Sequence, residues 1–265
     1  MAQGRDAELR EKYVSGVKTE VAIARARADV AAVHADLVRD GLALAAGGSV
    51  SGKVPGADLF VITPAGTAFA DVAPENLVLC GLDGASIAGT PGSEAAPSAA
   101  SLSHAYVYRH MTDVGGIVHA LSPYASAWAA RGQEIPCVLA IIAEEFGGPV
   151  PTGPLTLADD DSLGRGVVDA LAGRRPRAVL LQNLGPVVLG STVKDAANRA
   201  ALVEGVARIV QLARDGGLPS PLPQSDVDRL YEARAALQTP PAGRAAASTR
   251  SGRQLNIATK TKTSR

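Results

Sequence analysis

The sequence predicts an α/β fold, and three observations lead to that prediction. The chain has 265 residues, which is enough for one large domain, or for one domain and a tail. Short apolar runs bounded by Gly, Pro or Asp, of which residues 59–66 are the first, are typical of strands. Longer stretches, residues 20–40 and 191–216, carry apolar residues at helical spacing. Strand and helix patterns therefore occur together along one chain.

The composition argues against several classes of partner. The formal net charge is zero, so we expect no electrostatic attraction to nucleic acid or to a membrane. No apolar run reaches the ~20 residues that span a bilayer, and the charged N-terminus lacks the apolar core of a signal peptide. Cys80 and Cys137 lie far apart in apolar stretches and should be buried and unpaired. We therefore expect a cytoplasmic protein.

The N-terminal part should hold an arm, a helix and a Gly/Ser-rich turn. Residues 1–19 are polar and predict a loose arm or a fraying helix, and residues 20–40 predict the first helix of the domain. Residues 47–53 are either a hairpin loop or a turn whose N–H groups and hydroxyls bind an anion. On spacing alone the hairpin loop is the more common structure. Residues 77–89 predict two strands joined by an Asp-Gly turn.

The middle of the chain carries the residues of greatest chemical interest. Residues 101–111 predict a helix with His104 on its inward-facing stripe. Residues 114–133 predict a buried strand that delivers His119 and then a helix that begins after Pro123. Alternation along the strand should place His119 and Leu121 on the same face. A histidine at position 121 would complete the core of a metal site, but that position is leucine.

The C-terminal half predicts further strands and helices and then a change of composition. Glu144 and Glu145 end an apolar run that should be mostly strand and loop. Residues 239–265 carry six Lys/Arg and no acidic residue, and they should be disordered unless they dock on a neighbour. The domain should therefore span residues 20–238. Its remaining elements are predicted at residues 157–173 (helix), 177–190 (two strands), 191–216 (helix) and 226–237 (helix).

Five stretches of the sequence carry a resemblance to a known family. They are GSVSGK at 48–53, ITPAG at 62–66, PSAASLSH at 97–104, GGIVHALSPYASAWAARGQEIP at 115–136 and LLQNLGPVVLG at 180–190. From about residue 20 to residue 235, the chain resembles the class II aldolase/adducin family, with these segments in the same order. That family includes L-fuculose-1-phosphate aldolase and L-ribulose-5-phosphate 4-epimerase. The resemblance implies a three-layer α/β/α domain around a mainly antiparallel sheet. It also implies a homotetramer with pockets for a small-molecule substrate between subunits.

The family's zinc site does not carry over to this sequence. The resemblance places its three histidine ligands at His119, Leu121 and Leu184, and its acidic residue at Ala100. A catalytic zinc ion takes three protein ligands and keeps an open position, and leucine offers no lone pair. We therefore expect no metal site and no cofactor, although zinc is usual in the family.

The resemblance also assigns substrate-binding and catalytic positions. Substrate-binding residues are expected to be Gly48, Ser49, Ser51, Gly66, Ser98, Leu121 and Leu184. These places offer fewer donors than the family uses for phosphate, which favours a carboxylate or a less charged substrate. His119 and Glu144 are the expected catalytic residues, with Glu145 as an alternative to Glu144 and Tyr231 as a weaker candidate. In a pocket with Leu121, Leu184 and Phe146, such a carboxylate would have a raised pKa and could act as acid or base; a surface Glu pair is an equally good interpretation.

Three functions fit these positions. The first is a diverged enzyme that cleaves or rearranges bonds next to a carbonyl in a small carboxylate or aryl metabolite. It would resemble, for example, the aldolase-like oxygenases of aminocoumarin biosynthesis in bacterial specialised metabolism. The second is a non-catalytic interaction member, as the adducins are, with the basic tail as its interaction element. The third is a metal-dependent sugar-phosphate aldolase or epimerase with substitute ligands at His104, His119 and Glu144.

Overall fold

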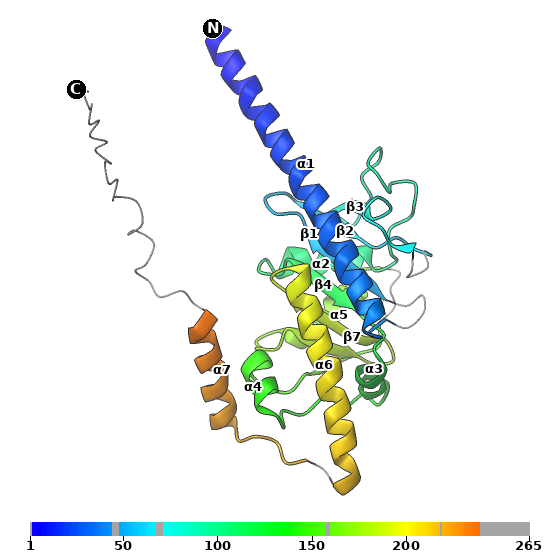
Figure 1. Cartoon of the computed structure of the whole chain (residues 1–265), viewed down its shortest axis with the longest axis vertical. Coiled ribbons are helices and arrows are strands. Elements are labelled where there is room, and N and C mark those ends of the chain that lie inside the picture. The colour runs from blue at the N-terminus through cyan, green and yellow to red at the C-terminus, as the bar shows by residue number, and fades with distance from the viewer. Residues whose placement is uncertain (1, 44–47, 67–70, 157–159, 218, 239–265) are drawn as a thin grey trace, which may run out of the picture.

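The computed structural model describes residues 2–43, 48–66, 71–156, 160–217 and 219–238 (Figure 1). Helices and strands alternate along most of this length. In chain order the elements are α1 (Ala2–Arg39), β1 (Ser49–Lys53), β2 (Leu59–Ile62), β3 (Val78–Gly81), α2 (Ser101–His110), β4 (Gly116–His119), α3 (Pro123–Ala130), α4 (Ala140–Phe146), β5 (Thr152–Gly153), α5 (Ser162–Leu171), β6 (Ala178–Leu181), β7 (Gly185–Gly190), α6 (Val193–Ala213), a 3-10 turn (Arg214–Gly216) and α7 (Gln224–Gln238).

The strands form one seven-stranded sheet in the order β3-β2-β1-β4-β7-β6-β5. Neighbouring strands are antiparallel except β5 and β6, which are parallel. The predicted mainly antiparallel sheet is therefore confirmed. β1 and β4 pair at the centre of the sheet, so residues at their ends sit close to both layers of helices.

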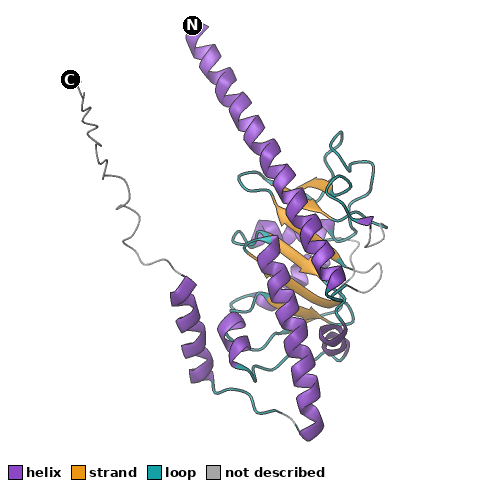
Figure 2. Cartoon of the chain, in the orientation of Figure 1, coloured by secondary structure: helices purple, strands orange, loops and turns teal. Residues whose placement is uncertain are grey.

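Helices cover both faces of this sheet. α1 and α6 lie across one face, in front of the strands in Figure 2, and α2 and α5 pack against each other on the other face. Alternation along β4 sends Val118 into the core under α1 and α6, and Ile117 into the core under α2 and α5. The predicted three-layer α/β/α arrangement is thus confirmed.

α6 approaches the sheet unusually closely at its N-terminus. A Cβ atom added to Gly116 would lie 2.3 Å from the backbone nitrogen of Val193, and one added to Gly190 would lie 2.3 Å from that of Ala196. Backbone atoms cannot move aside as a flexible side chain can. β4 and β7 therefore accept the first turn of α6 because both strands carry glycine there. Thr192 caps this turn, since its hydroxyl accepts a hydrogen bond from the Asp195 N–H.

Four sequence-based expectations change in the structure. Residues 1–19 were predicted as a loose arm or fraying helix, and from Ala2 onward they continue α1 as one helix, whose start extends beyond the sheet (Figure 1). Part of the 47–53 stretch is strand β1, not a hairpin loop. The second strand predicted in 77–89 shrinks to one bridge, Cys80 to Ser86. The start of the 157–173 helix and the tail at 239–265 lie outside the described residues.

The fourth change is α4, within a run predicted as strand and loop. Ile142, Ala143 and Phe146 are all buried, and their spacing places them on one face of a helix. Cys80 and Cys137 are buried and unpaired, as predicted. Among the helices described, none is long and apolar enough to cross a membrane.

Candidate functional site

The candidate site lies where β1 begins and β4 ends. Ser49 and His119 are directly opposite each other in the antiparallel pairing of these strands. Both side chains point to the α2 face, because Val50 and Val118 point into the α1/α6 core. Gly48 has φ +117°, and a Cβ atom there would lie 2.5 Å from the His119 carbonyl oxygen. Only glycine therefore lets the chain enter β1 beside His119. We call this place the Ser49–His119 edge.

His119 is held in a defined tautomer. Its ring is partly buried, and Nε2 lies 3.3 Å from the carbonyl oxygen of Leu184. A carbonyl oxygen only accepts, so Nε2 carries the proton and Nδ1 keeps a lone pair. Burial lowers the pKa of His119, and the hydrogen bond to Leu184 offsets only part of that effect. His119 is thus a neutral imidazole near pH 7, and Nδ1 is able to accept a proton.

Aliphatic residues occupy the positions where the resemblance places the other two zinc ligands and the acidic residue. Leu121 and Leu184 are both partly buried, and Ala100 is buried at the start of α2. A Leu121 methyl carbon lies 3.5 Å from the place where a Cβ on Gly185 would be, so Leu121 packs over the turn that carries Leu184. One imidazole among leucines does not fit zinc, which needs three ligands. In the described part of the chain, no three His, Cys, Asp or Glu side chains gather.

A second histidine lies directly behind this edge. His104 on α2 is buried, as its inward stripe predicted. Its Nε2 lies 3.0 Å from Ser49 Oγ, and its Nδ1 lies 2.7 Å from Ser51 Oγ. Ser51 Oγ in turn lies 2.8 Å from the hydroxyl of Tyr108. Burial, with a smaller effect from His119, lowers the pKa of His104 to about 3. His104 is therefore neutral and makes one donating and one accepting bond.

The loops that carry Gly66 and Ser98 also reach this end of the sheet. The Thr63 N–H donates to the Val50 carbonyl, and the Ser98 N–H donates to the Thr63 carbonyl. Gly66 is exposed, and the Ser98 hydroxyl accepts a bond from the Ala100 N–H. The structure thus brings Gly48, Ser49, Ser98 and the turn at Gly66 to one end of the sheet. Ser51 is different, because it is fully buried and has no surface for a ligand.

The predicted acids lie elsewhere in the chain. Glu144 is on α4, whose main neighbour is α7. Phe146 belongs to the core under α1 and α6, whereas Leu184 packs on the core of the opposite face. The prediction of a pocket with Phe146 and Leu184 beside a free glutamate is therefore wrong within one chain. Its physical reason is that α4 replaces the expected strand, which changes the direction of every side chain in the run.

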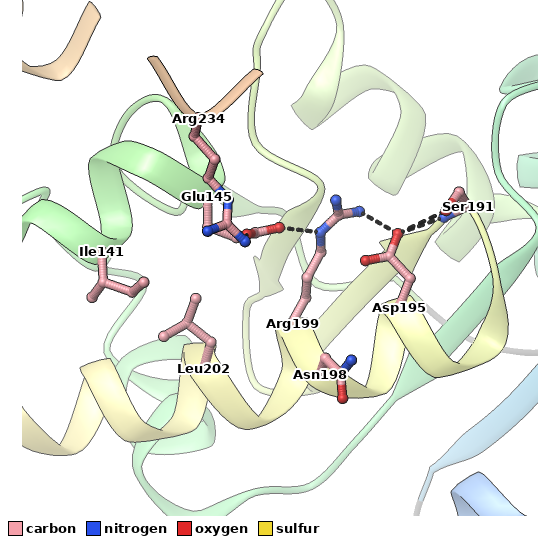
Figure 3. Close-up of a pocket in the computed structure, with 8 residues that line it drawn as sticks. All are labelled: Ile141, Glu145, Ser191, Asp195, Asn198, Arg199, Leu202 and Arg234. Atoms are coloured by element: carbon pink, nitrogen blue, oxygen red, sulfur yellow. Dashed lines mark hydrogen bonds and ion pairs between the residues drawn. The ribbon is translucent and has the colours of Figure 1, made fainter. Parts of the chain in front are cut away.

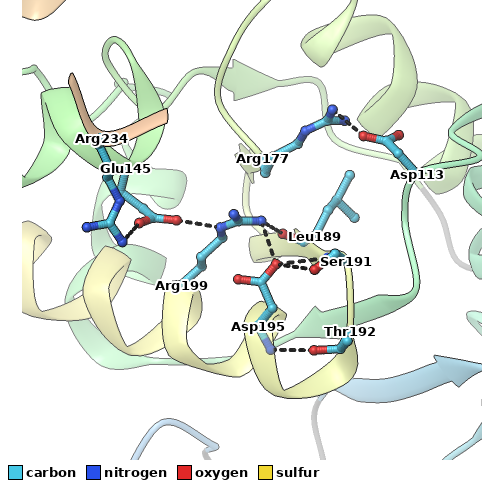
Figure 4. A network of polar contacts seen from close by, with 9 residues as sticks. All are labelled: Asp113, Glu145, Arg177, Leu189, Ser191, Thr192, Asp195, Arg199 and Arg234. Carbon is cyan, nitrogen blue, oxygen red and sulfur yellow. Dashed lines mark hydrogen bonds and ion pairs between the residues drawn. The ribbon is translucent and has the colours of Figure 1, made fainter. Parts of the chain in front are cut away.

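Glu145 is fixed by two arginines. It forms ion pairs with Arg199, at 2.7 Å, and with Arg234 (Figure 4). Arg199 also pairs with Asp195, which accepts bonds from the N–H and hydroxyl of Ser191. Glu145 is consequently a structural partner of α6 and α7 and is not a free acid or base. Tyr231, the weaker candidate, lies on α7, and the guanidinium group of Arg175 stacks over its ring.

Two cavities lie away from the Ser49–His119 edge. The first, of about 400 Å³, lies between α4, α6 and α7, and Figure 3 shows the ion-paired arginines on its wall. The second, of about 970 Å³, is a groove between α1, the β1–β2 turn and the start of α6. The residues that line the first are Ile141, Glu145, Ser191, Asp195, Asn198, Arg199, Leu202 and Arg234. Neither cavity includes His119 or Ser49.

Known proteins are similar to this chain in sequence and in fold. Residues 28–211 match the family described as "Class II Aldolase and Adducin N-terminal domain". A 5-deoxy-D-ribulose 1-phosphate aldolase of Bacillus thuringiensis is 31% identical over 77% of this chain and 92% of its own length. An L-ribulose-5-phosphate 4-epimerase of Salmonella paratyphi B is 29% identical over 68% of this chain and 81% of its own. A solved L-fuculose 1-phosphate aldolase superposes with a TM-score of 0.72 at 27% identity, covering 79% of this chain and 95% of that one.

Proposed function

The chain belongs to the class II aldolase and adducin family, and on that premise we propose a zinc-independent enzyme of carbonyl chemistry. Its substrate is a small carboxylate or aryl metabolite, and its reaction is cleavage or rearrangement next to the carbonyl. The observation that carries the proposal is the tautomer of His119. Its Nε2 proton is directed at the Leu184 carbonyl, which leaves Nδ1 as the base of the site.

In the proposed reaction, His119 both takes up and returns the proton. Nδ1 of His119 takes a proton from the carbon next to the carbonyl, and the electron pair moves into the carbonyl to give an enolate. For cleavage, the proton comes instead from a hydroxyl one carbon further away, and the intervening C–C bond supplies the electrons of the enolate. Ser49, at the start of β1, is directly opposite His119 in the sheet, so polar groups there are available to the enolate oxygen. The imidazolium then returns the proton to the product.

The substrate class follows from the polarity of the site. The curated relatives named above act on sugar phosphates. The Gly48–Ser49 turn and the Ser98 loop provide few hydrogen-bond donors. Leu121 and Leu184 add apolar surface at the two positions where the resemblance places the family's other histidine ligands. A dianionic phosphate would be poorly compensated there, whereas a carboxylate or an aromatic ring is suited to it.

The first test measures proton exchange without metal. Purified protein treated with EDTA is mixed with pyruvate or phenylpyruvate in D2O, and deuterium at the carbon next to the carbonyl is followed by NMR. The wild type should accelerate exchange over buffer, and His119→Gln should lose at least about tenfold of that rate, as expected for a general base. His110→Gln, on the exposed side of α2, is the matched control. Exchange that requires added zinc, or survives in His119→Gln, contradicts the proposal.

The same mixtures test an oxidative variant of the reaction. Aldolase-like oxygenases remove carbon from an arylpyruvate, and 4-hydroxyphenylpyruvate is therefore included with an oxygen electrode. Oxygen uptake that depends on His119 would place the chemistry in that class.

One observation favours a non-catalytic member as the second candidate. Leu121 packs over Gly185, in the turn whose Leu184 carbonyl accepts the hydrogen bond of His119, and so takes up space in that turn. In that case the native protein should retain no small molecule in mass spectrometry, and no substrate should exchange its proton.

A further inference from the structure

Four polar side chains form a single hydrogen-bonded chain that ends at the Ser49–His119 edge. It runs from the Tyr108 hydroxyl to Ser51, then through both nitrogens of His104, and ends at Ser49. Tyr108 and Ser51 are buried in the core, and Ser49 stands next to the partly exposed His119. One end of the chain is therefore closed, and the other reaches the site.

A neutral His104 has two tautomers, and each gives this hydrogen-bonded chain a different arrangement of donors. If Nδ1 carries the proton, Ser49 donates to His104, His104 to Ser51, and Ser51 to Tyr108. The Tyr108 proton is then left without an acceptor, because Ser51 is its only hydrogen-bond partner among the described residues. If Ser51 instead accepts from both His104 and Tyr108, its own proton is left unpaired in the core. If Nε2 carries the proton, Tyr108 donates to Ser51, Ser51 to His104, and His104 to Ser49.

The second direction pairs the donors of Tyr108, Ser51 and His104, and leaves only the proton of Ser49, a residue 3% exposed, without a partner. An unpaired hydroxyl proton inside an apolar core is costly, and the Tyr108 hydroxyl lies in the core with Phe60 against its ring. In the second direction the unpaired proton belongs to Ser49, which is the end of the hydrogen-bonded series that lies at the Ser49–His119 edge. The Ser49 hydroxyl then has its oxygen occupied by His104 and its proton free.

We infer that the Ser49 hydroxyl donates a hydrogen bond to the carbonyl oxygen of the substrate, and that Tyr108, Ser51 and His104 set its direction. Ser49 is the catalytic residue in this arrangement and the other three are positioning residues. The inference rests on the proposed function, because it supplies the enolate's partner opposite His119. Donor and base come from directly opposite positions of β1 and β4. A fixed donor supports the developing charge at a site without zinc ligands.

The direction of the chain is measured without any substrate. The protein has only four histidines, so selective ¹⁵N-histidine labelling gives a simple long-range ¹H–¹⁵N spectrum, assigned with single His→Gln variants. His104 should show a protonated Nε2 and an unprotonated Nδ1. In Tyr108→Phe, which keeps the ring but removes the last donor, Nδ1-protonated His104 should become populated. A wild-type His104 protonated on Nδ1 overturns the inference, whether or not any variant folds.

The donor role is measured with oxalate, a planar dianion that resembles the enolate of a 2-oxo acid. Ser49→Ala should weaken oxalate binding about 10- to 100-fold, the range for a hydrogen bond to a charged group. Ser49→Thr should restore most of it. Ser103→Ala, on the same helix as His104 and buried, is the control for packing. Equal binding by wild type and Ser49→Ala, or binding by neither, contradicts the donor role.

The two proposals fail separately. A His104 protonated on Nδ1, together with His119-dependent proton exchange, removes only the donor inference. Absence of exchange, with Nε2-protonated His104 and Ser49-dependent oxalate binding, removes only the proposed reaction.

Discussion

His104 and His119 are neutral in the folded protein because burial lowers the pKa of each imidazole. In the unfolded chain both would protonate near pH 6.5. The unfolded state therefore binds more protons below that pH, and the free energy of unfolding falls as the pH falls. His34 on α1 contributes in the same direction, since burial also lowers its pKa.

This difference in pKa gives a measurable loss of stability in acid. Between pH 7 and pH 5, His104 alone should remove about 2 kcal/mol, at ~1.4 kcal/mol per pH unit below 6.5. Urea unfolding at both pH values measures the loss. His104→Gln should show a smaller loss than wild type, although it is less stable at pH 7. His110→Gln should keep the wild-type loss. An equal loss in His104→Gln would contradict the assignment.

The leucines at positions 121 and 184 should be sufficient to explain an absence of zinc. The triple variant Leu121→His, Leu184→His and Ala100→Glu restores the three imidazoles and the carboxylate that the resemblance implies. We expect it to bind about one zinc ion per chain, as a three-histidine site does. Elemental analysis of dialysed protein measures this, with wild type alongside. Stoichiometric zinc in the wild type would contradict the zinc-independent proposal.

At the scale of single residues, the sequence predicted the element on which each histidine lies better than it predicted the side chains around it. It placed His119 on a strand and His104 on an inward stripe. It did not predict that Ser51 is buried behind His104, because a short Gly/Ser stretch has no clear period. Strand β1 becomes evident only when its partners β2 and β4 are in place.

At the scale of elements, α4 and α7 are the pair on which sequence and structure differ most. α7 was predicted as a helix over residues 226–237, whereas α4 was not predicted, because its seven residues are too few to separate a helix from a buried strand. In the structure, packing against α7 accompanies the helical form of α4. Tyr231 on α7 lies over Gly147, the left-handed residue that ends α4, and a Cβ atom there would lie 2.8 Å from the tyrosine ring.

Glu145 is expected to hold this pair of helices to α6. Glu145→Gln leaves Arg199 and Arg234 without their shared carboxylate, which is 8% exposed. We expect a loss of roughly 2 kcal/mol, less than for a fully buried pair because Arg234 is partly exposed. Urea unfolding measures the loss, and hydrogen exchange should show faster exchange in α7.

Asp228→Asn is the matched control for Glu145→Gln. It breaks the more exposed ion pair between Asp228, on α7, and Arg175, in the connection between α5 and β6, and should cost less than about 1 kcal/mol. Equal losses in both variants would show that Glu145 has no special role.

At the scale of the whole molecule, the order of elements was the most predictable property. Apolar patterns and turn residues define most elements, and the resemblance supplied the layers, which short-range patterns do not encode. Charge and composition could not indicate where the 400 Å³ cavity lies, since it depends on how α4, α6 and α7 meet.

We expect four copies of the chain to assemble. The Ser49–His119 edge belongs to neither of the two cavities described above, and the resemblance implies pockets between subunits. Light scattering should give about four times the mass of one chain, in keeping with closed symmetry. A monomer at micromolar concentration that still performs the exchange reaction would contradict this expectation.

The close seat of α6 on the sheet bears on how mutational scans of this protein are interpreted. Gly116 and Gly190 have no side chains and touch no substrate, yet even alanine would drive a carbon into the backbone of α6. We expect Gly116→Ala to fail to accumulate as folded protein, whereas Gly205→Ala, in open space on α6, should be tolerated. Intolerance to substitution will thus be greatest at some positions with no chemistry at all, and a ranking of sites by fitness alone would mistake helix spacing for catalysis.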